Sequence, residues 1–154
     1  MAKVSKLLQQ AIDNLIINDV YLHKSRSNCS DVFDPKAILG VDNLLVQQMH
    51  VVLKSEVISE HDDSYLLRVF IRLGTRWIAP EQEELQNENI NALIEADFIA
   101  EYQMLEVLDK KCIDEFALKN ASFHVWPYWR EYLSSQCERM RLPRVMLPAV
   151  QFNK

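Results

Sequence analysis

The stretch HVWPYWREYLSSQCERM, residues 124–140, contains the pattern that decides the fold. Its larger side chains recur every three or four residues, which is the spacing of one face of an α-helix. That stripe comprises Phe123, Trp126, Arg130, Leu133, Cys137 and Met140. Pro127 lies within it, removes one amide donor and crowds the carbonyl group of Phe123, at a cost of about 3 kcal/mol. We therefore predict a long helix that is kinked, with a second segment beginning at Tyr128.

The residues before this helix alternate between apolar and polar, which is the period of β-strands. The clearest strand is YLLRVFIRLGTRWI, residues 65–78, and a second is NALIEADFIAEYQML, residues 91–105. Residues 15–25 and 51–57 alternate more weakly, and in the first of these Ile16, Val20 and Leu22 are expected on one face. Because the intervening segment HDDS is typical of a tight turn, we predict an antiparallel sheet with one dry and one wet face.

Together these patterns predict an α+β fold, with a four-stranded antiparallel sheet followed by a long kinked C-terminal helix. A chain of 154 residues is expected to form a single domain. We divide it into a short N-terminal helix or arm at 1–14, the sheet at 15–105, the helix at 108–141 and an irregular apolar tail at 142–154.

Composition excludes several classes of function. The chain has only two glycines, Gly40 and Gly74, so no glycine-rich phosphate loop is present. A net charge of −5 argues against nucleic acid as a partner, and no apolar run is long enough to cross a bilayer. The histidines and cysteines lack metal-ligand spacing. We expect no metal, cofactor or membrane insertion, and the absence of a signal-like N-terminus predicts a cytoplasmic location.

Two motifs resemble a known family. VWPYWREYLSS, residues 125–135, is similar to the helix signature of the SecB protein-export chaperones, an aromatic residue followed by Pro-Tyr, any residue, Arg-Glu and then Ser-Ser. LPRVMLPAVQF, residues 142–152, resembles the loop that follows that helix in the family. The order of four strands and then helix also matches, so the resemblance covers roughly residues 15–152.

The resemblance implies an ATP-independent holdase that binds unfolded or aggregation-prone polypeptides along hydrophobic grooves, and that assembles as a homodimer or homotetramer. It implies no catalytic residue. Arg130 and Glu131 would form a structural ion pair or cap. The helix motif would serve the oligomer interface or a structural role through Trp126, Pro127, Tyr128, Trp129, Arg130 and Glu131.

The chain also departs from the export chaperones. It ends at Lys154, where that family continues into a second helix, so we expect the second family helix to be missing. Arg68, Arg72 and Arg76 are expected beside Glu95, Asp97 and Glu101 on the neighbouring strand. Such pairing would neutralise the acidic face that docks the SecA motor, so SecA is a doubtful partner. These departures favour the divergent SecB-like chaperones, some of which protect an antitoxin in toxin–antitoxin–chaperone systems.

A promiscuous polypeptide-binding surface needs apolar area with few demanding polar groups. The predicted client-binding residues are Leu44, Leu45, Val46, Leu142, Val145, Met146, Leu147, Val150 and Phe152. The clients would be preproteins or an antitoxin. An alternative is a non-chaperone adaptor or structural subunit whose apolar tail is occupied by one dedicated protein partner. A small enzyme is disfavoured because no nucleophile–base pair can be read from the sequence.

Overall fold

The computed structural model describes residues 5–37, 44–79, 90–145 and 147. The chain begins with α1 (Lys6–Asn14) and continues into β1 (Leu15–Cys29) and β2 (Leu45–Ser59). A short 3-10 turn, η1 (His61–Asp63), leads to β3 (Tyr65–Ile78), which is followed by β4 (Ile90–Met104). The helical part comprises α2 (Lys110–Phe116), the π-helical turn η3 (Ala117–Ala121) and α3 (Ser122–Met140).

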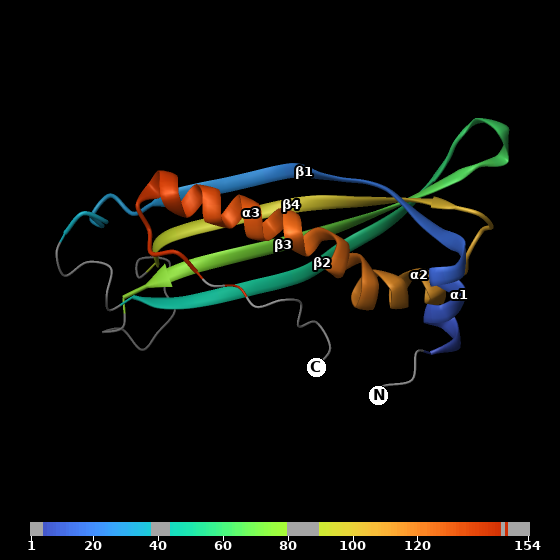
Figure 1. Ribbon diagram of the computed structural model, residues 1–154, viewed down its shortest axis with the longest axis horizontal. Coiled ribbons are helices and arrows are strands. Elements are labelled where there is room, and N and C mark those ends of the chain that lie inside the picture. Colours follow the sequence, from blue (N-terminus) through green and yellow to red (C-terminus); the bar gives the residue numbers. More distant parts are fainter. Residues whose placement is uncertain (1–4, 38–43, 80–89, 146, 148–154) are drawn as a thin grey trace.

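The four strands form one antiparallel sheet in the order β1-β4-β3-β2 (Figure 1). The predicted antiparallel sheet and the long helix after it are therefore confirmed. The turn expected at HDDS is also present, where Asp63 adopts a left-handed backbone conformation with φ 59° and the Ser64 hydroxyl donates to the carbonyl oxygen of His61. Since β1 and β2 lie at the two edges, each has one side without a strand partner in the described sheet.

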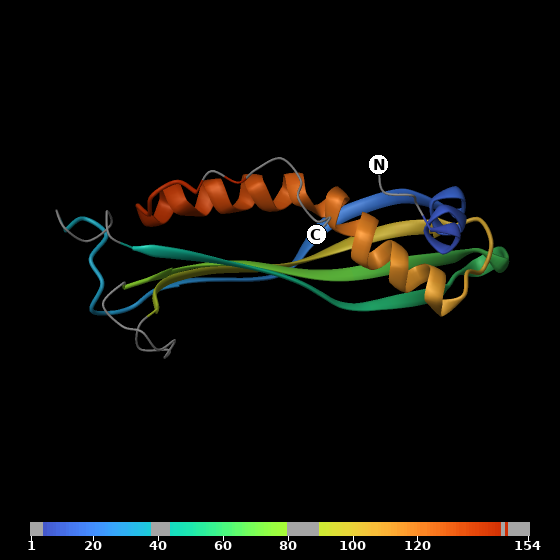
Figure 2. The ribbon, with the colours of Figure 1, turned by 90° about the horizontal axis from the view of Figure 1, so that it is seen from below.

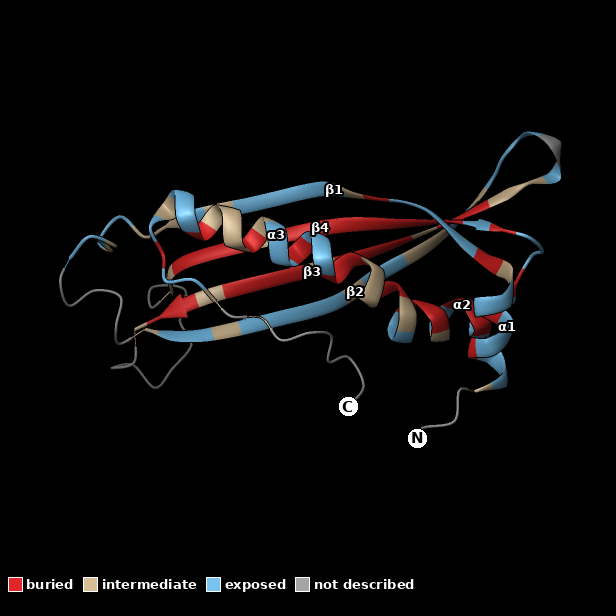
Figure 3. Ribbon diagram, viewed as in Figure 1, coloured by how far each residue is buried: buried red, intermediate tan, exposed pale blue. Residues whose placement is uncertain are grey.

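The sheet has one helix-covered face and one open face. Residues directly opposite in β3 and β4 point to the same side, so Leu67, Val69 and Ile71 of β3 share the helix-covered face with Phe98, Ala100 and Tyr102 of β4. All six are buried, and they form one core with residues of α2 and α3. The dry face predicted from alternation is therefore confirmed for both central strands, which Figure 3 shows as largely buried. The predicted wet face is wrong in part, because Phe70, Leu93 and Ile99 on the open face are also buried.

The first strand departs from the predicted alternation. Val20 pairs with Ala100 on the helix-covered face, whereas Ile16 pairs with Gln103 on the open face and is exposed. A register shift between Ile17 and Asp19 causes the difference, because one extra residue reverses the facing of every side chain before it. The prediction that Ile16, Val20 and Leu22 share a face is wrong for Ile16.

The C-terminal helix follows the sheet along one side. Figure 2 shows α3 on one side of the sheet, with a change of direction between α2 and α3. The π-helical turn at Ala117–Ala121 lies between these two segments, and such turns are a known cause of helix bending. The long helical segment is therefore bent, but no second segment begins at Tyr128, since α3 runs through Pro127 to Met140. The helix ends at Arg141, which has a left-handed conformation with φ 56°.

The buried stripe of α3 is shifted from the predicted one. Trp126, Trp129, Leu133 and Cys137 are buried, whereas Arg130 is exposed. Trp129 stacks on Tyr132, with ring centroids 6.3 Å apart, and Tyr132 meets Phe98 of β4 edge to face. The aromatic cluster therefore joins α3 to the sheet of its own chain. No helix in the described ranges is long and apolar enough to span a membrane.

Candidate polypeptide-binding surface

Strand β2 carries more exposed large apolar side chains than any other described helix or strand. Figure 3 shows β3 and β4 as buried bands, with exposed residues along the two edge strands. Six large apolar side chains of β2 are exposed: Leu45, Val46, Met49, Val51, Leu53 and Val57. They occur on both faces of the strand, because the β3 residues opposite them belong partly to the helix-covered face and partly to the open face. We call these six residues the β2 surface.

The other edge strand is less suited to contact an apolar chain. β1 has two register shifts, between Ile17 and Asp19 and between Leu22 and Lys24, and its second half is polar. Charged side chains and bulges are the devices by which proteins protect a sheet edge from pairing. β2 has a single shift, between Val52 and Lys54. The asymmetry favours β2 as the edge that receives an apolar segment.

Two of the predicted client-binding residues belong to this surface. Leu45 is 56% exposed and Val46 is 43% exposed, on opposite faces at the start of β2. Leu44 packs partly against the core. The sequence analysis missed Met49, Val51, Leu53 and Val57. The sequence feature that could have identified them is the presence of apolar residues at both odd and even positions of this strand. Such a strand has no consistently polar face.

The predicted tail residues have a different environment. Leu142 is only 7% exposed and belongs to the core, so we correct its assignment from client contact to structural packing. Val145 and Leu147 are partly buried against that core. Met146, Val150 and Phe152 lie outside the described residues. No helix forms at 141–145 or 147, the described part of the segment that follows α3.

A groove of about 560 Å³ lies between α3 and this following segment. Pro127, Arg130 and Glu131 line one side, and Val145 and Leu147 line the other. Two sets of predicted site residues thus meet in one place. Within the described part of the chain neither Arg130 nor Glu131 takes part in an ion pair, so the expected structural ion pair is not formed there. Because serines and charged residues dominate the walls, the groove suits an apolar ligand less well than the β2 surface does.

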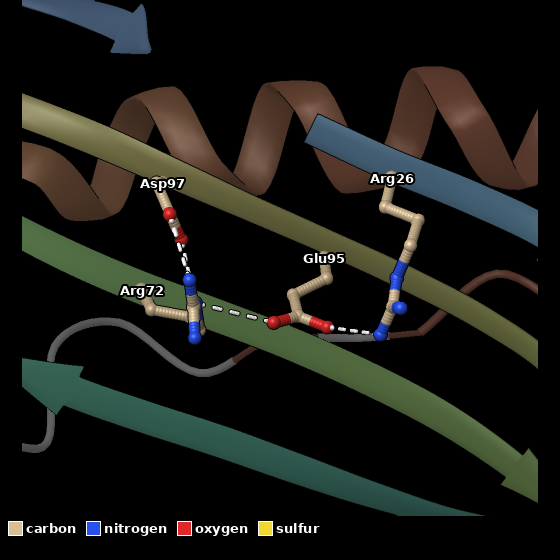
Figure 4. A network of polar contacts seen from close by, with 4 residues as sticks. All are labelled: Arg26, Arg72, Glu95 and Asp97. Carbon is tan, nitrogen blue, oxygen red and sulfur yellow. Dashed lines mark hydrogen bonds and ion pairs between the residues drawn. The ribbon is translucent and has the colours of Figure 1, made fainter. Parts of the chain in front are cut away.

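The open face carries a network of charges between strands. Arg72 donates to both carboxylate oxygens of Asp97, at 2.8 and 3.0 Å, and contacts Glu95 at 3.2 Å (Figure 4). Arg26 of β1 contacts the other oxygen of Glu95 at 3.0 Å. Arg68 pairs with Glu101 at 2.9 Å. The predicted neutralisation of the acidic residues is therefore confirmed for Arg68 and Arg72, and the hydrogen bond to each carboxylate raises the pKa of both guanidinium groups.

The junction of helix and sheet contains two polar contacts that each use an imidazole ring. The Nε2 atom of His50 on β2 lies 2.6 Å from the hydroxyl of Ser122, and the Nδ1 atom of His124 lies 2.7 Å from that of Tyr102. Burial lowers the pKa of both histidines and raises the pKa of Tyr102. A neutral His124 can accept a hydrogen bond at Nδ1 from the Tyr102 hydroxyl. This contact fixes the start of α3 on β4.

We expect the free energy of unfolding to fall as the pH drops below about 6.5, the ordinary histidine value. The lowered pKa of His124 means that the unfolded chain binds a proton there at a higher pH than the folded chain does, so protonation favours unfolding. The lowered pKa of His50 acts in the same direction. Urea titrations between pH 8 and pH 5 measure the effect. His124→Gln should reduce the loss on acidification, and an unchanged pH dependence in this variant would contradict the assignment.

The cysteines and the side chains that can bind a metal ion do not form a metal site in the described part of the chain. No group of three or more histidine, cysteine, aspartate or glutamate side chains in the described ranges could hold a metal ion. Burial raises the pKa of Cys137 to about 11, so this thiol is protonated and unreactive at neutral pH. Cys112 is buried as well, and Cys29 is partly exposed. The described surface offers exposed apolar side chains and the free edge of strand β2 for binding.

A four-stranded antiparallel sheet with one long helix across a single face is the SecB-like fold, and comparison with solved structures confirms it. The chain superposes on the SecB-like chaperone Rv1957 of Mycobacterium tuberculosis, solved in complex with a ChAD peptide from the HigA1 antitoxin, with a TM-score of 0.68. The alignment covers 96% of this chain and 98% of that one, at 14% sequence identity. By sequence, the chain matches no family model and no curated protein.

Proposed function

We propose that this protein is an ATP-independent chaperone of the SecB-like type, which holds non-native polypeptides by apolar contact. The observation that carries the proposal is the β2 surface, an uncovered apolar edge strand on a fold shared with a peptide-binding chaperone. An exposed apolar strand with a free edge is a hazard in an ordinary soluble protein, because it invites pairing with other chains. A holdase uses the same property, since it must accept many apolar segments.

The client is proposed to be an extended segment of an aggregation-prone protein, such as an antitoxin or a preprotein. The comparison protein is bound to an antitoxin peptide, which supports a polypeptide ligand for this chain too. On the open face, Arg68 and Arg72 pair with acidic side chains of β4, so these carboxylates are neutralised. This neutralisation disfavours docking of SecA, which would need a row of free carboxylates. We therefore favour antitoxin protection over export, in the cytoplasm.

Self-association is part of the proposal. The exposed side of the α3 motif presents Pro127, Tyr128, Arg130 and Glu131, whereas Trp126 and Trp129 are already buried within the chain. If the motif serves a homodimer or homotetramer, the contact between chains is made by these four exposed residues. The two tryptophans then have the structural role of holding the helix that presents them.

The test is suppression of the aggregation of chemically denatured citrate synthase, in the absence of ATP, with the mass measured by light scattering. Suppression near equimolar amounts by a dimer or tetramer is the expected result. A well-folded particle that leaves the aggregation unchanged would contradict the holdase. That outcome would instead favour an adaptor with one dedicated partner, which copurification from the native host would then identify.

A further inference from the structure

The open face contains one arginine that differs from its neighbours. Arg68, Arg72 and Arg76 follow one another along β3, and the first two lie opposite Glu101 and Asp97 of β4 and pair with them. Arg76 lies opposite Leu93. Among the described residues its only polar partner is the amide oxygen of Gln47 on β2, at 3.0 Å. A guanidinium group has five N–H donors, and within the described residues this contact uses one of them.

Arg76 lines a pocket of about 240 Å³ on that face. Arg26 and Glu95 line it from the side of β1 and β4, and Gln47 and Met49 line it from β2. Gly74 forms part of the floor: an added Cβ atom there would lie 3.0 Å from the Cε atom of Met49. A residue with a Cβ atom at this position would therefore require the end of the flexible Met49 side chain to move by a few tenths of an ångström.

The charges around the pocket favour a single negative charge. Two cations, Arg26 and Arg76, face one anion, Glu95, whose two oxygens are already bound to Arg26 and Arg72. A balance of two positive charges and one negative charge leaves one positive charge, which suits a carboxylate. A phosphate dianion would meet Glu95 without enough cations to offset both charges. Arg76 is also half-buried, so a hydrogen bond to it is stronger than one made in open water.

We propose that this pocket binds the carboxylate of an aspartate or glutamate side chain in the bound polypeptide. This site rests on the proposed function, because its ligand is the same segment that contacts the β2 surface. On the open face of β2 the exposed Leu45 and Met49 flank Gln47, the residue that holds Arg76. A bound segment that runs along β2 therefore contacts an apolar, a polar and an apolar side chain, each two residues apart in β2. The preferred client sequence has an acidic residue between two apolar residues, each two positions away.

The experiment compares two fluorescein-labelled peptides, one containing Leu-Ala-Glu-Ala-Leu and the other containing Leu-Ala-Gln-Ala-Leu. Fluorescence anisotropy with the full chain measures both affinities. We expect the glutamate peptide to bind about three- to tenfold more tightly, the range of a partly exposed charge-assisted contact. Arg76→Ala should remove this preference and Arg76→Lys should keep part of it. Lys119→Ala, which removes a positive charge from the helical side, is the matched control and should leave the preference intact.

Each other result has a definite meaning. Equal affinity of the wild-type chain for both peptides would overturn the carboxylate site while leaving the chaperone proposal standing. A preference that survives in Arg76→Ala would assign it to another cation and also overturn the site. If Arg76→Ala lowers the urea midpoint but leaves the preference unchanged, Arg76 serves a contact within the chain. Failure of both peptides to bind, together with no suppression of aggregation, would overturn the proposed function as well.

Discussion

Replacing Trp129 by alanine is expected to lower the free energy of unfolding by about 3–5 kcal/mol, the usual cost of truncating a buried aromatic residue. Trp129 is 1% exposed and stacks on Tyr132, which in turn contacts Phe98 of β4. The cavity would open between α3 and the sheet, where few side chains can move to fill it. Because a domain of this size has about 5–15 kcal/mol of stability, the variant should be close to its limit at 37 °C.

The neighbouring residue provides the matched control. Tyr128 is 48% exposed on the outer side of the same helical turn, and Tyr128→Ala should change the stability of the single chain, apart from any contact with a second copy, by no more than about 0.5 kcal/mol. Urea unfolding followed by far-ultraviolet circular dichroism measures both variants without relying on the tryptophan signal. If Trp129→Ala keeps wild-type stability but changes the oligomer mass, the motif is an intermolecular contact first. Equal losses in the two variants would show that both rings are buried in an assembly.

Much of the sheet could be predicted because every second residue of its two central strands is apolar. From Leu67 to Leu73 in β3 and from Ala92 to Met104 in β4 these residues are all buried, so the sequence predicts the face that packs against the helices, although Phe70, Leu93 and Ile99 interrupt the alternation. β1 could not be predicted in the same way. The register shift near Asn18 adds one residue to the strand, and nothing in the letters IINDV marks where the ladder breaks.

The helix shows where a strong local signal is outweighed by packing. Pro127 removes one backbone hydrogen bond, yet α3 continues through it because Trp126 and Trp129 on either side are held in the core. The irregular turn occurs earlier, at Ala117–Ala121, in a segment whose residues are compatible with ordinary helix. A π-helical turn changes which side chains face the sheet, and this change has no signature in composition.

Only part of the candidate binding surface could be predicted from the sequence, for a related reason. Apolar residues in the tail suggested client contact, but Leu142 is buried, since a chain with one long helix uses the following segment to complete its core. The exposed residues lie on β2, where sequence alone cannot separate a buried strand from an uncovered edge. Strand order decides the matter, because β2 has a neighbour on one side only. Apolar content identifies candidates, and topology determines which of them face solvent.

Leu45→Ser combined with Val46→Ser is expected to raise the amount of protein needed for half-suppression of citrate synthase aggregation roughly tenfold. Burying a leucine or valine side chain fully is worth about 1.5–3 kcal/mol, and these two side chains are about half exposed before a client binds. Contact with a client can therefore contribute about 1 kcal/mol or more at each position, and about 1.4 kcal/mol in total already gives a tenfold change.

The control must remove equal apolar area from another place. Leu105 and Val107, in the connection between β4 and α2, are 60% and 63% exposed, and Leu105→Ser with Val107→Ser should leave suppression close to the wild-type value. Both double variants should keep the wild-type far-ultraviolet spectrum and urea midpoint, because all four side chains lie outside the core. A loss confined to the β2 variant locates the client on that edge strand. Equal loss in both variants would mean that clients adhere to exposed apolar surface wherever it occurs, and a loss in neither would move the site to the groove beside Val145 and Leu147.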